Sequence, residues 1–144
     1  MKRLLFISLI LTSVFGCKKD SLDSANLNSA FTSTISGPWK LVAVERTSID
    51  NKNVWEPVPA AQSDTLIFRG DGLILYGDGS PRCCAPKSLV INGILRDIKP
   101  QQAVPANPLC ATVNCVYCPT WELSWTDDQL IVSSCMNARE KYVR

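Results

Sequence analysis

The sequence predicts an all-β protein whose one domain is a small antiparallel β-barrel of about seven or eight strands, stapled by disulfides. Three observations support this fold class. Short apolar runs recur from residue 39 onward and are separated by clusters of Gly, Pro, Asn and Asp, which form turns. No segment of that region shows a convincing helical periodicity of apolar residues. Six cysteines lie between residues 83 and 135, and an even number is typical of a disulfide framework.

The first 16 residues have the three-part plan of a secretory signal peptide. Lys2 and Arg3 supply a positive start, an apolar run follows over residues 4–15, and the small Gly16 ends it. The apolar run is about twelve residues long, whereas a helix needs roughly 20 to cross the hydrocarbon core of a bilayer. We therefore predict that residues 1–16 are a signal peptide and not a permanent membrane span.

The segment Val14-Phe15-Gly16-Cys17 resembles the lipobox of bacterial lipoproteins. The resemblance implies that the thiol of Cys17 is diacylated, that the chain is cleaved before it, and that the new amine is acylated. Several acyl chains, at about 0.8 kcal/mol per buried methylene, exceed what stable anchoring requires. The expected partner is thus the membrane, and the expected location is the bacterial cell envelope, on the periplasmic or surface face of the outer membrane. Plain secretion is the alternative.

Residues 17–36 are rich in Ser, Asn, Asp and Thr and contain few large apolar side chains. Such a segment buries too little surface to fold by itself. We predict a flexible tether over residues 17–36 and a folded domain over residues 37–144, which is about one domain's length.

Charge and composition exclude several classes of function. Loss of Lys2 and Arg3 from the 15 basic residues leaves the mature chain with as many basic as acidic side chains, because all 13 acidic residues follow Cys17. This balance argues against nucleic acid as a partner. The chain contains no histidine, so it lacks the usual general base and the commonest metal ligand. We expect no enzyme activity, no catalytic residue, no metal site and no cofactor.

Turn signals in the sequence separate the expected strands. Asp71 lies between two glycines at the centre of the first predicted hairpin, since Asp-Gly favours a tight turn. The pair Asn92-Gly93 indicates either a second hairpin or a bulged strand, and the segment 126–129 supplies a further turn. The predicted strands are Trp39–Ile49, Thr65–Arg69, Leu73–Tyr76, Leu89–Ile98 (one strand or a pair), Trp121–Trp125, Leu130–Ser134 and Arg139–Arg144.

The opening Gly37-Pro38-Trp39 matches the Gly-x-Trp that begins the first strand of lipocalins, and it stands at the start of the domain as it does there. Together with the strand pattern and the lipobox, it makes the chain similar to lipocalin-like lipoproteins of Bacteroidota. The resemblance implies that a late arginine packs over Trp39 and closes the barrel. Arg144 and Arg139 are both candidates for this role.

The six remaining cysteines are expected to form structural disulfides, because export leads to an oxidising compartment. Adjacent Cys83 and Cys84 are expected to have different partners. A cluster of iron and sulfur, a zinc site and a redox pair formed by Cys115 and Cys118 are alternatives. The cysteines concerned are Cys83, Cys84, Cys110, Cys115, Cys118 and Cys135.

The lipocalin resemblance implies a small apolar or amphipathic ligand, which is the leading function hypothesis. Trp121 and Trp125 share one face of their strand and are candidates for lining a pocket. A small barrel can also be filled by its own side chains. The alternative function is then an envelope protein–protein interaction module without a ligand. A cavity of roughly 300 Å³ would favour the first hypothesis, and a filled barrel with a large exposed apolar patch would favour the second.

Overall fold

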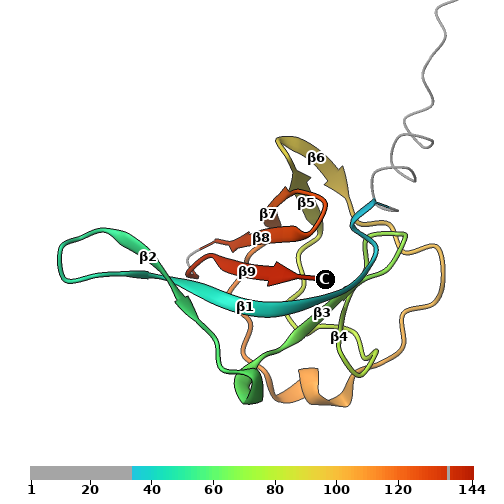
Figure 1. The fold of residues 1–144 in the computed structure, drawn as a ribbon. Coiled ribbons are helices and arrows are strands. Elements are labelled where there is room, and N and C mark those ends of the chain that lie inside the picture. The colour runs from blue at the N-terminus through green and yellow to red at the C-terminus, as the bar shows by residue number, and fades with distance from the viewer. Residues whose placement is uncertain (1–33, 136) are drawn as a thin grey trace, which may run out of the picture.

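The computed structural model describes residues 34–135 and 137–144, and the predicted signal peptide and Cys17 lie outside this part. In it the chain forms nine strands and two short 3-10 turns (Figure 1). None of its helices is long and apolar enough to cross a membrane. The prediction of an all-β fold is confirmed. The elements are β1 (Gly37–Thr47), β2 (Asn53–Pro57), η1 (Ala60–Gln62), β3 (Thr65–Phe68), β4 (Ile74–Tyr76), β5 (Ser88–Ile91), β6 (Ile94–Asp97), η2 (Pro108–Thr112), β7 (Thr120–Trp125), β8 (Gln129–Ser134) and β9 (Glu140–Val143).

The strands form one curled, mostly antiparallel sheet in the order β4-β3-β1-β9-β8-β7-β5-β6. Strand β1 is long enough to pair with β3 along its first half and with β2 along its second half, while β9 occupies its other edge. The second half of β1 and its partner β2 form a hairpin that extends as an arm away from the other strands (Figure 1). The strands thus make a half-barrel, with β4 and β6 as the outer strands of the described sheet.

One pairing departs from the expected antiparallel pattern: β5 and β7 run parallel. Parallel neighbours need a long connection, because the chain must return to the same end of the sheet before the second strand begins. Here the return is made by β6 and then by residues 98–119, which we call the cysteine loop. This loop contains Cys110, Cys115 and Cys118.

The turns form where the sequence indicates them. The β3–β4 hairpin closes with a hydrogen bond from the Arg69 amide to the Leu73 carbonyl, and Gly72 between them has a φ of 87°. The segment Leu89–Ile98 is a strand pair, β5 and β6, and not one bulged strand. Its turn residues Asn92 and Gly93 both have positive φ, as a two-residue hairpin of type I′ requires.

Strand β2 is the element that the sequence analysis did not predict. Its four residues other than Trp55 are exposed, so the strand lacks an alternating pattern. Trp55 is half-buried, with the Lys141 Nζ 4.3 Å from its ring centre. At the base of the arm, Arg139 forms an ion pair with Glu45 and lowers the pKa of that carboxyl.

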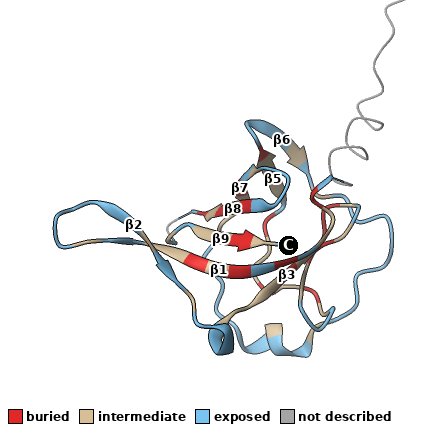
Figure 2. Cartoon of the chain, in the orientation of Figure 1, coloured by how far each residue is buried: buried red, intermediate tan, exposed pale blue. Residues whose placement is uncertain are grey.

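The interior of the half-barrel is filled by the protein's own side chains. The buried residues alternate along β7 and β8, so that one face of each strand contributes to the core (Figure 2). Ile35, which precedes the predicted domain start at residue 37, is 1% exposed and belongs to the same core. The largest fully buried side chains are Trp39, Tyr142, Phe68, Ile35, Leu66, Ile74, Leu89, Ile91, Leu123, Leu130 and Val132.

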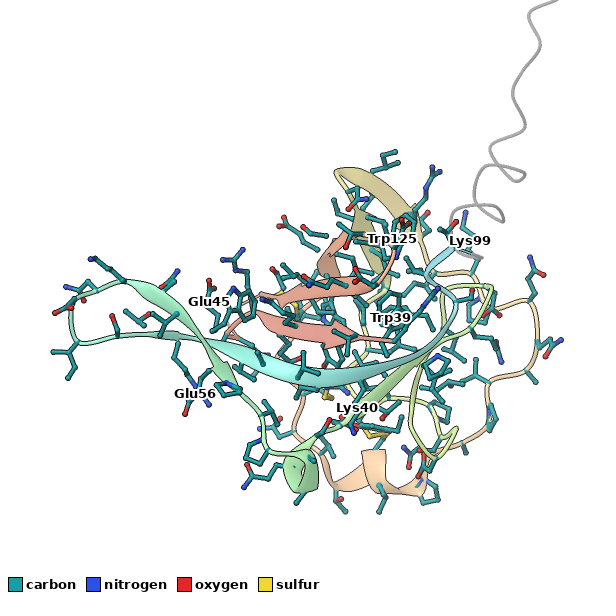
Figure 3. All side chains as sticks on the ribbon, viewed as in Figure 1. Trp39, Lys40, Glu45, Glu56, Lys99 and Trp125 are labelled. Carbon is teal, nitrogen blue, oxygen red and sulfur yellow. A yellow bond between two sulfur atoms is a disulfide. The ribbon has the colours of Figure 1, made fainter. Side chains whose placement is uncertain are left out.

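Arg144 closes the end of the sheet at which β1 begins. Its guanidinium carbon lies 4.4 Å from the centre of the Trp39 ring, and its Nη2 donates to the carbonyls of Thr34 and Ser36. The indole Nε1 of Trp39 donates to the Ile35 carbonyl at 2.8 Å. Of the two candidate arginines, Arg144 therefore packs on Trp39. Arg139 lies at the base of the arm, where Glu45 also projects (Figure 3).

All six cysteines of the domain form disulfides, which confirms that prediction. The pairs are Cys83–Cys110, Cys84–Cys115 and Cys118–Cys135. The neighbours Cys83 and Cys84 have different partners, as expected, and together they hold the cysteine loop at two points. Cys115 and Cys118 are each bonded elsewhere, so the C-x-x-C spacing does not form a dithiol pair.

Asp71 connects the β3–β4 turn to the cysteine loop. Its carboxylate accepts hydrogen bonds from the Arg69 guanidinium, from the Leu73 amide and, at 2.9 Å, from the Gln101 amide. The side chain of Asp71 is only 7% exposed. The bond from Arg69, with help from the two amides and against the effect of burial, lowers the pKa of Asp71 to about 2.

Replacement of Asp71 by Asn is expected to make the domain less stable and to weaken its acid dependence. A carboxyl whose pKa falls on folding stabilises the protein above its unfolded pKa, near 3.9, and this contribution is lost as the pH falls toward 2. The shift corresponds to roughly 2 kcal/mol at pH 7. Urea unfolding at pH 7 and at pH 2 to 3 measures it.

The matched control is Asp97→Asn, because Asp97 forms an ion pair with Lys99 at the surface. Such exposed pairs contribute only about 0 to 1 kcal/mol. If the Asp71→Asn and Asp97→Asn variants lose equal stability at pH 7, Asp71 does not have the assigned role.

Candidate ligand-binding cleft

The strand registers place three strand ends together at the end of the sheet opposite Trp39. Ser134 at the end of β8 lies beside Trp121 near the start of β7, and β9 begins nearby with Glu140. Tyr76, the last residue of β4, pairs with Leu66 of β3 and lines the same hollow from the other side of the curled sheet. We call the hollow at this end the Arg82 cleft.

The Arg82 cleft has a volume of about 300 Å³. Its wall has polar and apolar surface in similar amounts: seven of the eleven lining residues are aromatic, aliphatic or disulfide-bonded, and one arginine and one glutamate add opposite charges. Two hollows of about 450 Å³ elsewhere on the described surface are wider and shallower. The lining residues of the Arg82 cleft are Tyr76, Arg82, Cys83, Cys84, Val113, Val116, Cys118, Trp121, Ser134, Asn137 and Glu140.

Arg82 is held in place by its backbone and by three side chains. Its amide donates to the Ile74 carbonyl, so the residue continues alongside β4 after the turn at 77–80. Its guanidinium carbon lies 5.3 Å from the Tyr76 ring centre and 5.6 Å from that of Trp121, within the range of cation–π attraction. Its Nη1 is 3.2 Å from a carboxylate oxygen of Asp64. The guanidinium is therefore fixed before any ligand arrives.

Glu140 presents a carboxylate to the same cleft. One of its oxygens accepts a hydrogen bond of 2.7 Å from the hydroxyl of Tyr142. Tyr142 is 1% exposed. Burial, together with the charge of Glu140, raises the pKa of the Tyr142 hydroxyl above its ordinary value. The hydroxyl stays protonated and continues to donate its hydrogen bond, which orients the Glu140 carboxylate.

The cysteine loop forms the remaining wall. The two disulfides to Cys83 and Cys84 fix the loop against the segment after β4 that carries Arg82. The side-chain amide of Asn107 adds a further link, because its Nδ2 donates to the Pro81 carbonyl at 2.8 Å. Val113 and Val116 thereby face the cleft although neither belongs to a strand.

The two tryptophans proposed as pocket residues have different positions. Trp121 is 6% exposed and lines the Arg82 cleft. Trp125 is the last residue of β7 and does not line the cleft. Within the described residues, neither indole nitrogen has a hydrogen-bond partner. The structure therefore does not bring both tryptophans to one site.

Tyr76, Arg82 and Glu140 were not singled out from the sequence. Arg82 directly precedes Cys83 and Cys84 in the sequence. Two adjacent disulfide-forming cysteines could have indicated that the backbone at Arg82 is held in one position. Glu140 lies in the last strand without any motif around it. Among the described residues, no group of three or more His, Cys, Asp or Glu side chains is placed to hold a metal ion.

Comparisons with protein-family models, with curated proteins and with solved structures found no match to this chain.

Proposed function

We propose that this protein is a lipid-anchored lipoprotein of the bacterial cell envelope whose lipocalin-like domain binds a small amphipathic molecule in the Arg82 cleft. The observation that carries the proposal is the cleft itself. Its volume of about 300 Å³ reaches the lower limit for small-molecule sites. Its wall combines apolar side chains with a similar amount of polar surface, which suits a molecule that has both polar and apolar parts.

The position of the cleft is compatible with the predicted anchor. The described chain begins at Thr34, whose carbonyl accepts from Arg144 at the Trp39 end of the sheet. If residues 18–33 form the predicted tether, they would span roughly 20 to 24 Å on average from a lipid on Cys17. The Arg82 cleft, at the opposite end, would then open away from the bilayer.

A second candidate function is supported by the exposed apolar side chains of the cysteine loop. Leu109, Val116 and Tyr117 are each more than 70% exposed. Exposed large apolar side chains mark a protein–protein interface where they gather into one patch. The loop would then contact a protein in the envelope, with no small molecule bound.

Native mass spectrometry of the mature protein is expected to show a bound molecule. Purified from the envelope without reductant, the protein should have a native mass above its denatured mass. Val116→Trp is expected to reduce the excess, because Val116 lies at the exposed rim of the cleft and the larger side chain narrows its opening. Val104→Trp is the matched control, since Val104 is an exposed residue of the same loop outside the cleft lining.

The two candidate functions predict different results. Equal native and denatured masses for the wild type would contradict small-molecule binding and favour the protein-interaction function. An excess that Val116→Trp and Val104→Trp reduce equally would place the bound molecule outside the Arg82 cleft.

A further inference from the structure

The Arg82 cleft contains a positive and a negative group that are not paired with each other. No ion pair joins Arg82 to Glu140 in the described structure, although both line the cleft. Each has another partner instead: Arg82 donates a hydrogen bond to Asp64, and Glu140 accepts one from the Tyr142 hydroxyl. Opposite charges that are fixed but separated leave room for a ligand that contacts both.

Both groups retain hydrogen-bonding capacity toward the cleft. Arg82 uses Nη1 for Asp64, and among the described residues its Nε and Nη2 have no acceptor. Glu140 uses Oε2 for Tyr142, and its Oε1 has no donor in the same part of the chain. A guanidinium edge with two free donors matches a carboxylate. A carboxylate oxygen without a donor can accept a hydrogen bond from an ammonium group.

The balance of charge and the volume restrict the ligand further. A purely anionic ligand would be repelled by Glu140, and a purely cationic one by Arg82. A volume of about 300 Å³ is at the small end of ligand sites, which favours a molecule the size of one amino acid over a larger one. Val113, Val116 and the Trp121 ring provide an apolar wall for its side chain.

We propose that the Arg82 cleft binds a single free amino acid with an apolar side chain, in its zwitterionic form. Arg82 receives the α-carboxylate and Glu140 receives the α-ammonium group. This inference rests on the proposed function, because it names the class of amphipathic molecule that occupies the same cleft.

The test compares three probes of similar size with the intact mature protein by isothermal titration calorimetry. L-Leucine carries both charged groups, 4-methylpentanoate lacks the ammonium, and 3-methylbutylamine lacks the carboxylate. Leucine is expected to bind at least about tenfold more tightly than either analogue, because each analogue leaves one fixed charge of the cleft without a partner.

Two variants test which residue binds each charged group of the amino acid. Glu140→Gln is expected to weaken leucine binding by about tenfold and to leave 4-methylpentanoate unaffected or tighter. Arg82→Gln is expected to weaken leucine and 4-methylpentanoate but not 3-methylbutylamine. Glu56→Gln and Arg46→Gln are matched controls, since these residues form a surface ion pair between the strands of the arm, outside the cleft lining. Thermal unfolding of each variant identifies any loss of fold.

The outcomes separate this inference from the proposed function. If 4-methylpentanoate or 3-methylbutylamine binds as tightly as leucine, the amino-acid inference is overturned while binding of an amphipathic molecule stands. If leucine does not bind at all, the inference is also overturned. The native mass of the protein from the envelope then decides whether the proposed function fails with it.

Discussion

The double variant Cys84→Ala, Cys115→Ala is expected to lose about 2 kcal/mol of unfolding free energy. The two cysteines are 31 positions apart, but the neighbouring Cys83–Cys110 bond already closes most of that span, so the Cys84–Cys115 bond closes a further loop of only about seven residues in the unfolded state. This is a large share of the stability of a small domain. Urea unfolding monitored by tryptophan fluorescence, with intact mass to verify the remaining disulfides, measures the effect.

The same variant is expected to weaken binding at the Arg82 cleft. Cys115 directly precedes Val116 in the chain, so loss of its bond to Cys84 releases the apolar wall of the cleft. The Cys83–Cys110 bond and Asn107 still hold the other part of the cysteine loop. A loss below about 1 kcal/mol would show that the loop keeps its position without this disulfide.

Replacement of Cys17 by Ser is expected to transfer the protein from the membrane fraction to the soluble envelope fraction. A serine hydroxyl at this position removes the thiol to which the lipobox resemblance assigns the diacyl group. Without acyl chains, each of which contributes about 0.8 kcal/mol per buried methylene, no stable anchor remains. Fractionation of cells, with mass analysis of the N-terminal peptide, measures both the location and the modification.

Ser21→Ala is the control for this variant, because it changes a nearby residue of the predicted tether and leaves the thiol in place. It should remain in the membrane fraction with its acyl groups. Retention of Cys17→Ser protein in the membrane fraction would contradict the predicted anchor and would require another mode of attachment.

Several elements of the fold were predictable because their signals are local. The Asp71 turn and the Asn92-Gly93 turn each specify a hairpin within a few residues, and each hairpin forms as expected. Strand β2 was missed because its one half-buried residue, Trp55, is covered by Lys141 and Arg139. Those partners are far away in the sequence.

The candidate site was less predictable than the fold. Trp121 was recognised as a possible pocket residue, but its pairing with Trp125 was not realised at one site. Arg82 and Glu140 are separated by most of the second half of the domain and share no motif. Their common position follows from the return of the chain beside β4 and from the register of β8 and β9.

The sequence by itself determined the all-β class, the local hairpins, the alternation that turns one face of β7 and β8 inward, and the capacity of six cysteines to form disulfides. These properties depend on neighbouring residues and on composition, so they can be read without knowing distant contacts. Only the tertiary structure decided the parallel β5–β7 pairing, the three disulfide partners, the choice of Arg144 over Arg139 and the existence of the Arg82 cleft. Each of these joins segments far apart in the chain, and their relative positions are set by the packing of the whole core rather than by any local preference.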